Sequence, residues 1–180
     1  MSSAGRRAEE VDLAALALVP GAGHDEPHAL ALEPLVMGGQ EYAVAPVRLR
    51  LGVSRSGAGF ALRMRGDLAL QGACWRCLEP ARLDVSLDVR EYSGDDATDP
   101  DLACEYVDGE VLDLGAWARD AIAEAVPPTI LCRDGCAGLC PACGANLNEG
   151  PCGCAEGGAP PIDPRWAGLE DVARRLADEG

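Results

Sequence analysis

Residues 47–53 read Val-Arg-Leu-Arg-Leu-Gly-Val, and this alternation of apolar and polar residues decides the fold class. Successive side chains of a β-strand point to opposite faces, so the stretch predicts a strand with one apolar face. Segments 60–70 and 83–89 repeat the pattern. The apolar positions expected on the shared face are Val47, Leu49, Leu51, Val53, Phe60, Leu62, Met64, Leu68, Leu70, Leu83, Val85, Leu87 and Val89. We therefore expect an antiparallel sheet that buries one face.

Short connections join these strands. Residues 54–59, Ser-Arg-Ser-Gly-Ala-Gly, are typical of a hairpin turn, which we centre at residues 56–57. A fourth short strand is predicted over residues 104–107, before a turn at Asp108-Gly109. Residues 93–101 are expected to form an acidic loop between the third and fourth strands.

One helix is predicted after the sheet, with Asp113 as its N-cap and Pro127-Pro128 as its end. Its apolar stripe consists of Leu114, Trp117, Ala118, Ala121, Ile122 and Ala125. Because this stripe can cover the apolar face of the sheet, the fold class is α+β. A C-terminal helix is predicted to begin at Asp163 and Pro164. Its apolar side would consist of Trp166, Leu169, Val172, Ala173 and Leu176.

Eight of the nine cysteines occur in four close pairs. The pairs are Cys74/Cys77, Cys132/Cys136, Cys140/Cys143 and Cys152/Cys154, and Cys104 stands alone. Eight thiolates in four pairs are the ligand count of two tetrahedral zinc sites, so the sequence predicts two structural Zn²⁺ ions. A lone cysteine on a strand is most often a small buried apolar residue.

The spacing favours one grouping of these pairs. Cys140-Pro-Ala-Cys143-Gly has the form of a zinc knuckle, in which the glycine permits a positive φ and backbone N–H groups turn toward sulfur. Its simplest partner is Cys152-Gly-Cys154, which leaves Cys74/Cys77 to join Cys132/Cys136. In the alternative grouping, Cys132 or Cys136 serves the tail site and Cys152/Cys154 binds nothing. Four thiolates suit iron as well as zinc.

Two other interpretations of the cysteines remain. Cys74-Trp-Arg-Cys77 alone has the form of a redox dithiol, although the surrounding pattern is not a strand-to-helix turn. A disulfide framework is disfavoured by the odd cysteine count and by the reducing compartment inferred below.

Residues 1–40 contain many turn-forming Gly and Pro residues, so we expect a mostly irregular N-terminal arm. His24 and His28, the only histidines, are interpreted as loop residues because Pro27 argues against a helix that would present both to a metal. We divide the chain into this arm (1–40), a sheet and helix core (41–131) and a cysteine-rich zinc module with the C-terminal helix (132–180).

Composition excludes several classes of function. The net charge of -15 repels a bare phosphate backbone at long range. No apolar run is long enough for a transmembrane helix, and the acidic residues before the apolar run 13–19 do not suit a signal peptide, so we expect a cytoplasmic protein. The chain has neither a Gly-rich phosphate loop nor a Gly-x-Ser-x-Gly motif. Ions saturated by four thiolates also leave no position for a reactive water, so no enzyme is predicted.

Arg48, Arg50, Arg63 and Arg65 alternate with apolar residues on the first hairpin. A turn centred at 56–57 places Arg50 opposite Arg63 and Arg48 opposite Arg65, and facing like charges destabilise a sheet unless something neutralises them. RNA phosphate would do so, and so would Asp84 and Asp88 of the third strand, and we favour these aspartates. The four arginines are therefore candidate residues for binding RNA or another partner.

Four motifs in order resemble those of the YceD family, the large ribosomal RNA subunit accumulation proteins. They are Cys-x-Arg-Cys-Leu-Glu-Pro (74–80), Cys-x-Gly-Leu-Cys-Pro-x-Cys-Gly-x-Asn-Leu-Asn (136–148), Cys-x-Cys (152–154) and Ile-Asp-Pro-Arg-Trp-Ala-x-Leu (162–169). The resemblance covers roughly residues 40–176. It implies a bacterial factor required for accumulation of the large-subunit ribosomal RNA. It also implies that Cys74 and Cys77 group with Cys132 and Cys136, since some members lack the tail module.

Two classes of function follow. The first is a non-enzymatic ribosome-biogenesis factor that binds an assembling large-subunit component, either a basic ribosomal protein or precursor rRNA, with no membrane and no small-molecule substrate involved. The acidity of the chain favours the basic protein. The second is a zinc or thiol redox-responsive regulatory protein, whose Cys-x-x-Cys pair would release metal on oxidation.

Overall fold

The computed structural model describes residues 10–57, 59–94 and 103–154. The chain forms two compact units, Met1–Cys136 and Ala137–Gly180. The first unit contains all of the described helices and strands. In chain order these are β1 (Glu10–Asp12), η1 (Ala14–Leu16), β2 (Gly23–Leu30), β3 (Leu35–Met37), β4 (Gln40–Val44), β5 (Val47–Ser56), β6 (Gly59–Ala73), β7 (Pro80–Ser93), β8 (Val107–Asp108), β9 (Val111–Asp113) and α2 (Leu114–Ala125).

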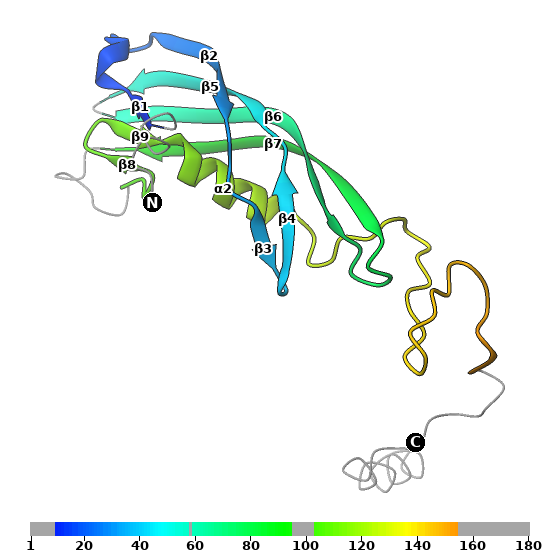
Figure 1. The fold of residues 1–180 in the computed structure, drawn as a ribbon. Helices are drawn as coiled ribbons and strands as arrows, with labels where there is room; N and C mark the ends of the chain where they lie inside the picture. Colours follow the sequence, from blue (N-terminus) through cyan, green and yellow to red (C-terminus); the bar gives the residue numbers. More distant parts are fainter. Residues whose placement is uncertain (1–9, 58, 95–102, 155–180) are drawn as a thin grey trace, which may run out of the picture. The chain divides into compact units, whose positions relative to one another are not determined.

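The main sheet is antiparallel and is organised around the long strand β6. On one side β6 pairs first with β5 and then with β4, and on the other side it pairs with β7 along its whole length. Strand β2 extends the sheet beyond β5, and β3 extends it beyond β4 (Figure 1). A second small sheet has the order β1-β9-β8.

The predicted alternation is confirmed, because one face of the sheet supplies the core. The fully buried side chains on this face include Leu49, Leu51, Leu62, Met64 and Leu70. Helix α2 contacts β7 on the same side and buries its own apolar stripe (Figure 1). Within that stripe Trp117 and Ile122 are 2% and 0% exposed, whereas the predicted member Ala125 is exposed. The α+β class follows from this sheet and helix.

The ends of α2 are those that the sequence predicts. The side chain of Asp113 accepts a 2.8 Å hydrogen bond from the backbone N–H of Ala116, which is an N-cap. The helix ends at Ala125, and the extended backbone of the next residue, Val126, leads into Pro127-Pro128. A proline provides no N–H for a further helical bond, so the helix cannot continue.

The prediction of a mostly irregular arm over residues 1–40 is wrong for the described part of that segment. Strand β2 pairs with β5 over eight residues, and His24 and His28 lie half-buried on this strand instead of in a loop. Their Nε2 atoms lie 3.1 and 3.2 Å from the two carboxylate oxygens of Glu26. Pro27 is tolerated because β2 is an edge strand, where alternate N–H positions point away from the neighbouring strand.

The predicted register of the first hairpin is also wrong. Ser56 pairs with Gly59, so the loop has two residues and its centre lies one position later than predicted. Gly57 has a φ of 61°, as such a tight hairpin turn requires. Arg50 therefore lies opposite Arg65, and Arg63 lies opposite Gly52. The predicted strand over residues 104–107 is shorter than expected, because β8 begins only at Val107.

The described part of the second unit, residues 137–154, is a compact loop structure. An isolated bridge joins Leu139 to Asn146, and the N–H of Leu147 donates a 2.9 Å hydrogen bond to the carbonyl of Gly138. The side chain of Asn148 accepts from the N–H of Ala137 at 2.8 Å. The predicted C-terminal helix and most of the predicted acidic loop 93–101 lie outside the described residues. No described helix is long and apolar enough to cross a membrane.

Candidate metal centres

The first cluster of cysteines is built from two distant parts of the first unit. Cys74 and Cys77 lie in the loop that joins β6 to β7, and Cys132 and Cys136 follow α2. The N–H of Trp75 donates a 2.9 Å hydrogen bond to the carbonyl of Ile130. The guanidinium of Arg76 donates a 3.0 Å bond to the carbonyl of Cys136. These two bonds hold the β6–β7 loop against the segment after α2.

The sulfur atoms of this first cluster have the spacing that a tetrahedral metal requires. The Sγ atoms of Cys74 and Cys136 are 3.7 Å apart, and those of Cys77 and Cys132 are 3.6 Å apart. Four thiolates at about 2.3 Å from a zinc ion would have sulfurs about 3.8 Å apart. A disulfide has an S–S distance of about 2.05 Å, so these are not disulfides. None of the nine cysteines forms a disulfide.

The second cluster is local to residues 140–154. It brings together Cys140, Cys143, Cys152 and Cys154, whose sulfur atoms all lie within 4.8 Å of one another. Cys140 is buried, Cys152 and Cys154 are half-buried, and Cys143 is exposed. The first cluster is more enclosed, since Cys74, Cys77 and Cys136 are all buried and only Cys132 is half-buried. The two groups of four are those that the spacing of the cysteines favours.

The two Cys-x-x-Cys loops have the same backbone geometry. In the first, the N–H of Leu78 donates to the carbonyl of Cys74 at 3.0 Å, and the N–H of Cys74 donates to the carbonyl of Glu79 at 2.8 Å. In the second, Gly144 and Ala145 make the equivalent bonds with Cys140, both at 2.8 Å. The residue after the second cysteine has a positive φ in each loop, 63° at Leu78 and 74° at Gly144. Both loops therefore form the same tight turn, which we call a knuckle, although only the second has the glycine that a positive φ favours.

Backbone N–H groups in each knuckle stabilise a thiolate. Those of Ala142 and Cys143, helped by the Cys152 thiol, lower the pKa of Cys140 to about 6. Burial raises the pKa of Cys74, but N–H groups that include those of Cys77, Cys132 and Arg76 outweigh it and lower the pKa to about 6.

One other cysteine in each cluster, Cys132 in the first and Cys154 in the second, has a raised pKa instead. Burial and the neighbouring thiols raise the pKa of Cys132 to about 12, and the Cys143 thiol together with burial raises that of Cys154 to about 12. A metal that binds four thiolates must therefore displace protons from Cys132 and Cys154.

Cys104 takes no part in either cluster. It is 7% exposed, and burial followed by nearby Glu91 and Glu105 raises the pKa of its thiol. This is the small buried apolar residue that the sequence predicts, and it offers a natural control for experiments on the other eight cysteines.

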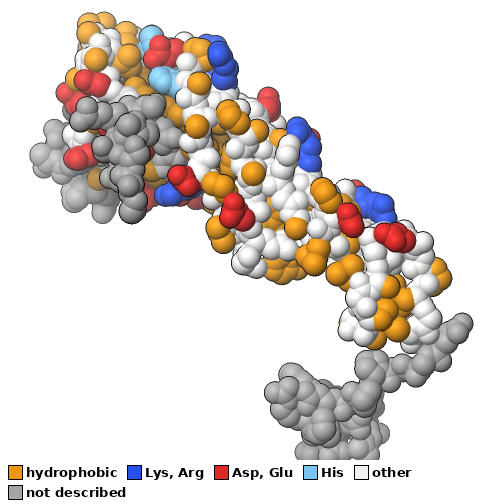
Figure 2. All heavy atoms as spheres, in the orientation of Figure 1, with side chains coloured by type: hydrophobic (Ala, Val, Ile, Leu, Met, Phe, Trp, Pro, Cys, Tyr) orange, Lys and Arg blue, Asp and Glu red, His pale blue; other side chains and the backbone are white. Residues whose placement is uncertain are grey.

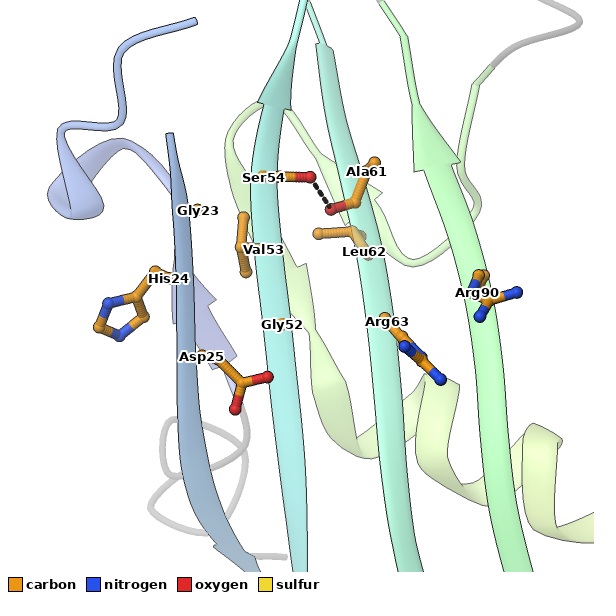
Figure 3. A pocket seen from close by; sticks show the side chains of 10 residues that line it. All are labelled: Gly23, His24, Asp25, Gly52, Val53, Ser54, Ala61, Leu62, Arg63 and Arg90. Carbon is orange, nitrogen blue, oxygen red and sulfur yellow. Dashed lines mark hydrogen bonds between the residues drawn. The ribbon is translucent and has the colours of Figure 1, made fainter. Parts of the chain in front are cut away.

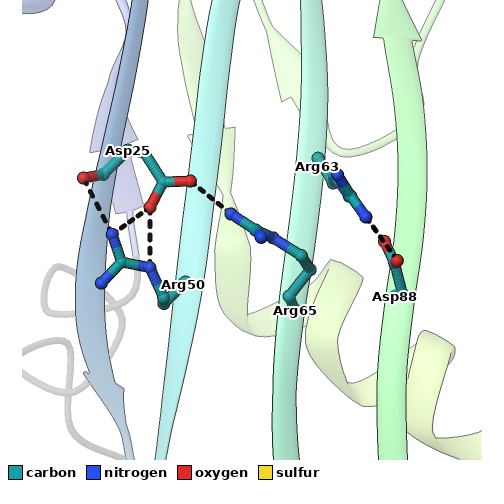
Figure 4. Close-up of polar contacts among 5 residues, drawn as sticks. All are labelled: Asp25, Arg50, Arg63, Arg65 and Asp88. Atoms are coloured by element: carbon teal, nitrogen blue, oxygen red, sulfur yellow. Dashed lines mark hydrogen bonds and ion pairs between the residues drawn. The ribbon is translucent and has the colours of Figure 1, made fainter.

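The four candidate arginines lie on the outer face of the sheet, opposite the face that carries α2. Asp88 of β7 pairs with Arg63, with Nε–Oδ1 and Nη2–Oδ2 distances of 2.7 and 2.5 Å (Figure 4). Asp25 of β2 pairs with both Arg50 and Arg65 (Figure 4). Internal pairing is thus confirmed for three of the four arginines, with Asp25 rather than Asp84 as the second partner. Asp84 pairs with Arg82 instead.

Sequence reasoning missed Asp25 because its strand carries no apolar alternation. Over residues 23–30 the polar residues His24, Asp25, Glu26 and His28 occupy both faces, so periodicity gives no signal for a strand. The Arg50 and Arg65 guanidiniums lower the pKa of Asp25, chiefly through the hydrogen bond from Arg50. The Arg63 hydrogen bond likewise lowers the pKa of Asp88.

The fold and the two four-cysteine clusters define a small α+β protein with two sites suited to structural metal ions. Residues 62–173 match the family described as "Large ribosomal RNA subunit accumulation protein YceD". The chain belongs to the YceD family.

Relatives in mycobacteria share most of this chain. Uncharacterized proteins of Mycobacterium bovis and Mycobacterium tuberculosis are 33% identical over 174 residues, which cover 90% of this chain and 80% of each relative. An uncharacterized protein of Mycobacterium leprae is 32% identical over 106 residues, which cover 55% of this chain and 46% of that protein. No solved structure matches the chain.

Proposed function

We propose that this protein is a non-enzymatic, cytoplasmic factor that supports accumulation of the large-subunit ribosomal RNA, and that two zinc ions stabilise its fold. The family description supports the link to the large ribosomal subunit, and it names accumulation of an RNA rather than a reaction. The partner is a component of the assembling large subunit, either a basic ribosomal protein or precursor rRNA.

The observation that carries the proposal is the pair of four-cysteine clusters. Each cluster supplies four sulfurs at mutual distances that suit one tetrahedral ion. Four thiolates fill every position of such an ion, so no site is left for a reactive water, and the metal has a structural role. A structural zinc site contributes on the order of 10 kcal/mol to folding, which is large beside the total stability of a small domain.

A redox-responsive role is the second candidate, and the second cluster is where it would reside. Cys143 is the one exposed cysteine, so an oxidant reaches it more easily than the buried cysteines of the first cluster. Oxidation there would release metal from residues 140–154. The burial of Cys74, Cys77 and Cys136 supports a structural role for the first cluster.

The proposal is tested by replacing the gene in its own bacterium with variants of the full chain and measuring the ratio of large- to small-subunit rRNA. Deletion of the gene should lower this ratio. The Cys74→Ser/Cys77→Ser variant should also give a low ratio, because loss of the first metal destabilises the sheet. The Cys104→Ala variant should give a normal ratio. A normal ratio in the deletion strain would refute the assembly function.

A further inference from the structure

The outer face of the sheet carries an unusual grid of arginines. The strand register aligns Asp25, Gly52, Arg63 and Arg90 in one row across β2, β5, β6 and β7. The next row along the strands contains Pro27, Arg50, Arg65 and Asp88. Two pairs of arginines, Arg63/Arg90 and Arg50/Arg65, therefore lie directly opposite each other. Facing like charges destabilise a sheet, so this arrangement needs compensating anions.

The protein supplies only part of that compensation. Asp25 and Asp88 pair with three of the arginines, as described above. Arg90 and Arg48, the arginine one step further along β5, make no ion pair with any residue that the structure describes. Asp67, which lines the same hollow of this face as Arg48, instead accepts a 2.6 Å hydrogen bond from Ser86. Two guanidiniums on this face thus have their hydrogen-bonding edges available.

Both of these arginines border hollows in the face. The first hollow has a volume of about 410 Å³, and its floor consists of residues with small or no side chains, among them Gly23, Gly52 and Ala61 (Figure 3). Arg63 and Arg90 stand at its side (Figure 3). The second hollow, of about 500 Å³, lies beside Arg48, Arg50 and Arg65. Each hollow provides space for an anionic group next to an arginine.

The local charge on this face is opposite to that of the whole chain. The two hollows are lined by five arginines and three aspartates, a formal excess of two positive charges, while the chain as a whole carries -15. Elsewhere acidic, basic and apolar side chains are interspersed on the surface in view (Figure 2). A polyanion is thus repelled by the molecule at long range but finds a complementary surface here.

We propose that this outer face binds the phosphate backbone of RNA, with Arg48 and Arg90 as the residues that contact phosphate. The inference rests on the proposed function, which provides ribosomal RNA as the polyanion. Guanidinium groups bind phosphate oxygens through two parallel hydrogen bonds, and rows of side chains on one face repeat about every 6.8 Å along a strand. A chain of phosphates can therefore occupy both hollows, whereas a single phosphate ion fills only one.

The face lacks the groups that recognise bases. The residues that line the two hollows include no Phe, Tyr or Trp, and the one imidazole, that of His24, points away from the first hollow (Figure 3), so the face offers no aromatic platform for base stacking. Recognition would consequently depend on phosphates, with little preference for sequence and a strong dependence on salt. RNA is favoured over a basic protein at this face because a basic protein would bring more positive charge to an arginine surface.

Binding is tested with full-length, metal-loaded protein and a fluorescein-labelled RNA duplex of arbitrary sequence, by fluorescence anisotropy over a range of salt concentrations. Arg48→Gln/Arg90→Gln should weaken binding about tenfold and reduce the slope of log K against log salt by between about 1 and 2, as expected for about two lost phosphate contacts. The matched control is Arg82→Gln/Arg119→Gln, which removes the same charge. Its arginines pair with Asp84 and Asp120 and line neither hollow.

Three results would overturn the inference. They are an equal loss in the control variant, an unchanged affinity in Arg48→Gln/Arg90→Gln, and binding of a labelled oligo-lysine peptide in place of RNA. Metal content and thermal unfolding of each variant show that it is folded. Failure of the proposed function is distinguishable, since it appears as a normal rRNA ratio in the deletion strain whatever the anisotropy shows. A restored ratio with Arg48→Gln/Arg90→Gln, together with unaltered RNA binding, refutes only the role of this face.

Discussion

The backbone N–H of Trp75, in the loop between β6 and β7, donates a 2.9 Å hydrogen bond to the carbonyl of Ile130, beyond α2. Together with the bond from the Arg76 side chain to the carbonyl of Cys136, it brings the two halves of the first cysteine cluster together. The helix between them is consequently part of the site, because it determines where Cys132 and Cys136 lie. Metal binding at the first cluster is thus coupled energetically to the folding of the first unit.

Removing two ligands of the first cluster should halve the metal content. Protein purified without oxygen should contain about two zinc ions per chain, and Cys74→Ser/Cys77→Ser should contain about one, as measured by elemental mass spectrometry. The same variant should unfold at a much lower temperature, since its sheet and helix lose their shared metal. Cys104→Ala should keep about two ions. If wild type and variant both contain about one, the first cluster binds no metal and the redox interpretation gains support.

Leu78 has a conformation that suits glycine better. Its φ of 63° lies in the left-handed region, and its side chain is 59% exposed, so it loses little apolar burial when it is replaced. Leu78→Gly should relieve the backbone strain and raise stability by up to about 1 kcal/mol, after allowing for the greater freedom of glycine in the unfolded chain. Urea unfolding of the metal-loaded protein measures the effect.

The second knuckle provides the reverse experiment. Gly144 has a φ of 74°, and a Cβ at this position would have no other atom within 4 Å, so Gly144→Ala adds strain without a clash. This variant should release zinc from the second cluster more readily to a competing chelator.

A Leu78→Gly protein that is less stable than wild type would show that the strain at Leu78 is offset by contacts of its side chain.

Gly72 leaves room for the buried ring of Tyr42. A Cβ at position 72 would lie 2.4 Å from Cδ1 of Tyr42 and 3.0 Å from the backbone carbonyl oxygen of Glu41. Tyr42 is 2% exposed and cannot move away freely, so Gly72→Ala should destabilise the protein by about 1–3 kcal/mol through overpacking. Gly23→Ala is the matched control, because the nearest atom to its Cβ would be 3.6 Å away. Equal thermal unfolding of the two variants would contradict the expected clash.

Glu91 should make stability depend on pH. It lies half-buried opposite Leu62, and burial, followed by Glu105 and Glu124, raises its pKa above the ordinary 4.5. A raised pKa in the folded state favours the protonated form. The protonated Glu91 side chain therefore contributes to the free energy of unfolding. This contribution is fully present below pH 4.5, and it is lost as the pH rises through the raised pKa of the folded state. Glu91→Gln should therefore be more stable than wild type at about pH 7, and the difference should disappear toward about pH 4.

Thermal unfolding at a series of pH values measures this difference, and Glu41→Gln, at an exposed position of β4, is the control that should change little at any pH. A Glu91→Gln variant with the same stability as wild type at neutral pH would show that the carboxylate is adequately solvated.

Much of the fold follows from local sequence patterns. The alternation in β5, β6 and β7, the N-cap at Asp113 and the local cluster within residues 140–154 each depend on residues near one another in the chain, and spacing predicts each of them. The long-range first cluster was favoured by elimination and by the family resemblance. Strand β2 was not predictable in this way, because its side chains are mostly polar on both faces and its pairing with β5 decides its conformation. The role of Asp25 as counterion of two arginines depends on that pairing and was missed with it.

The register of the first hairpin was the second feature that the sequence did not predict correctly. Placing the first hairpin turn one residue too early moved each arginine by two positions relative to its neighbour strand. Glycines on both sides of the turn made either position acceptable locally. A shift of two residues keeps every side chain on the same face, so the alternation of apolar residues did not distinguish the two registers. The rows of arginines on the outer face therefore became visible only with the strands in place.

The distance along the chain between the ligands of the first cluster also orders events during synthesis. Cys74 and Cys77 leave the ribosome early, but they wait for β7, the small sheet and α2 before Cys132 and Cys136 emerge. Closing this long loop has a larger entropic cost than closing the short second cluster, so the sheet must form first and hold the ends close. A nascent chain can therefore complete its first metal site only after nearly the whole first unit has been made, which makes the ion a marker of a finished domain.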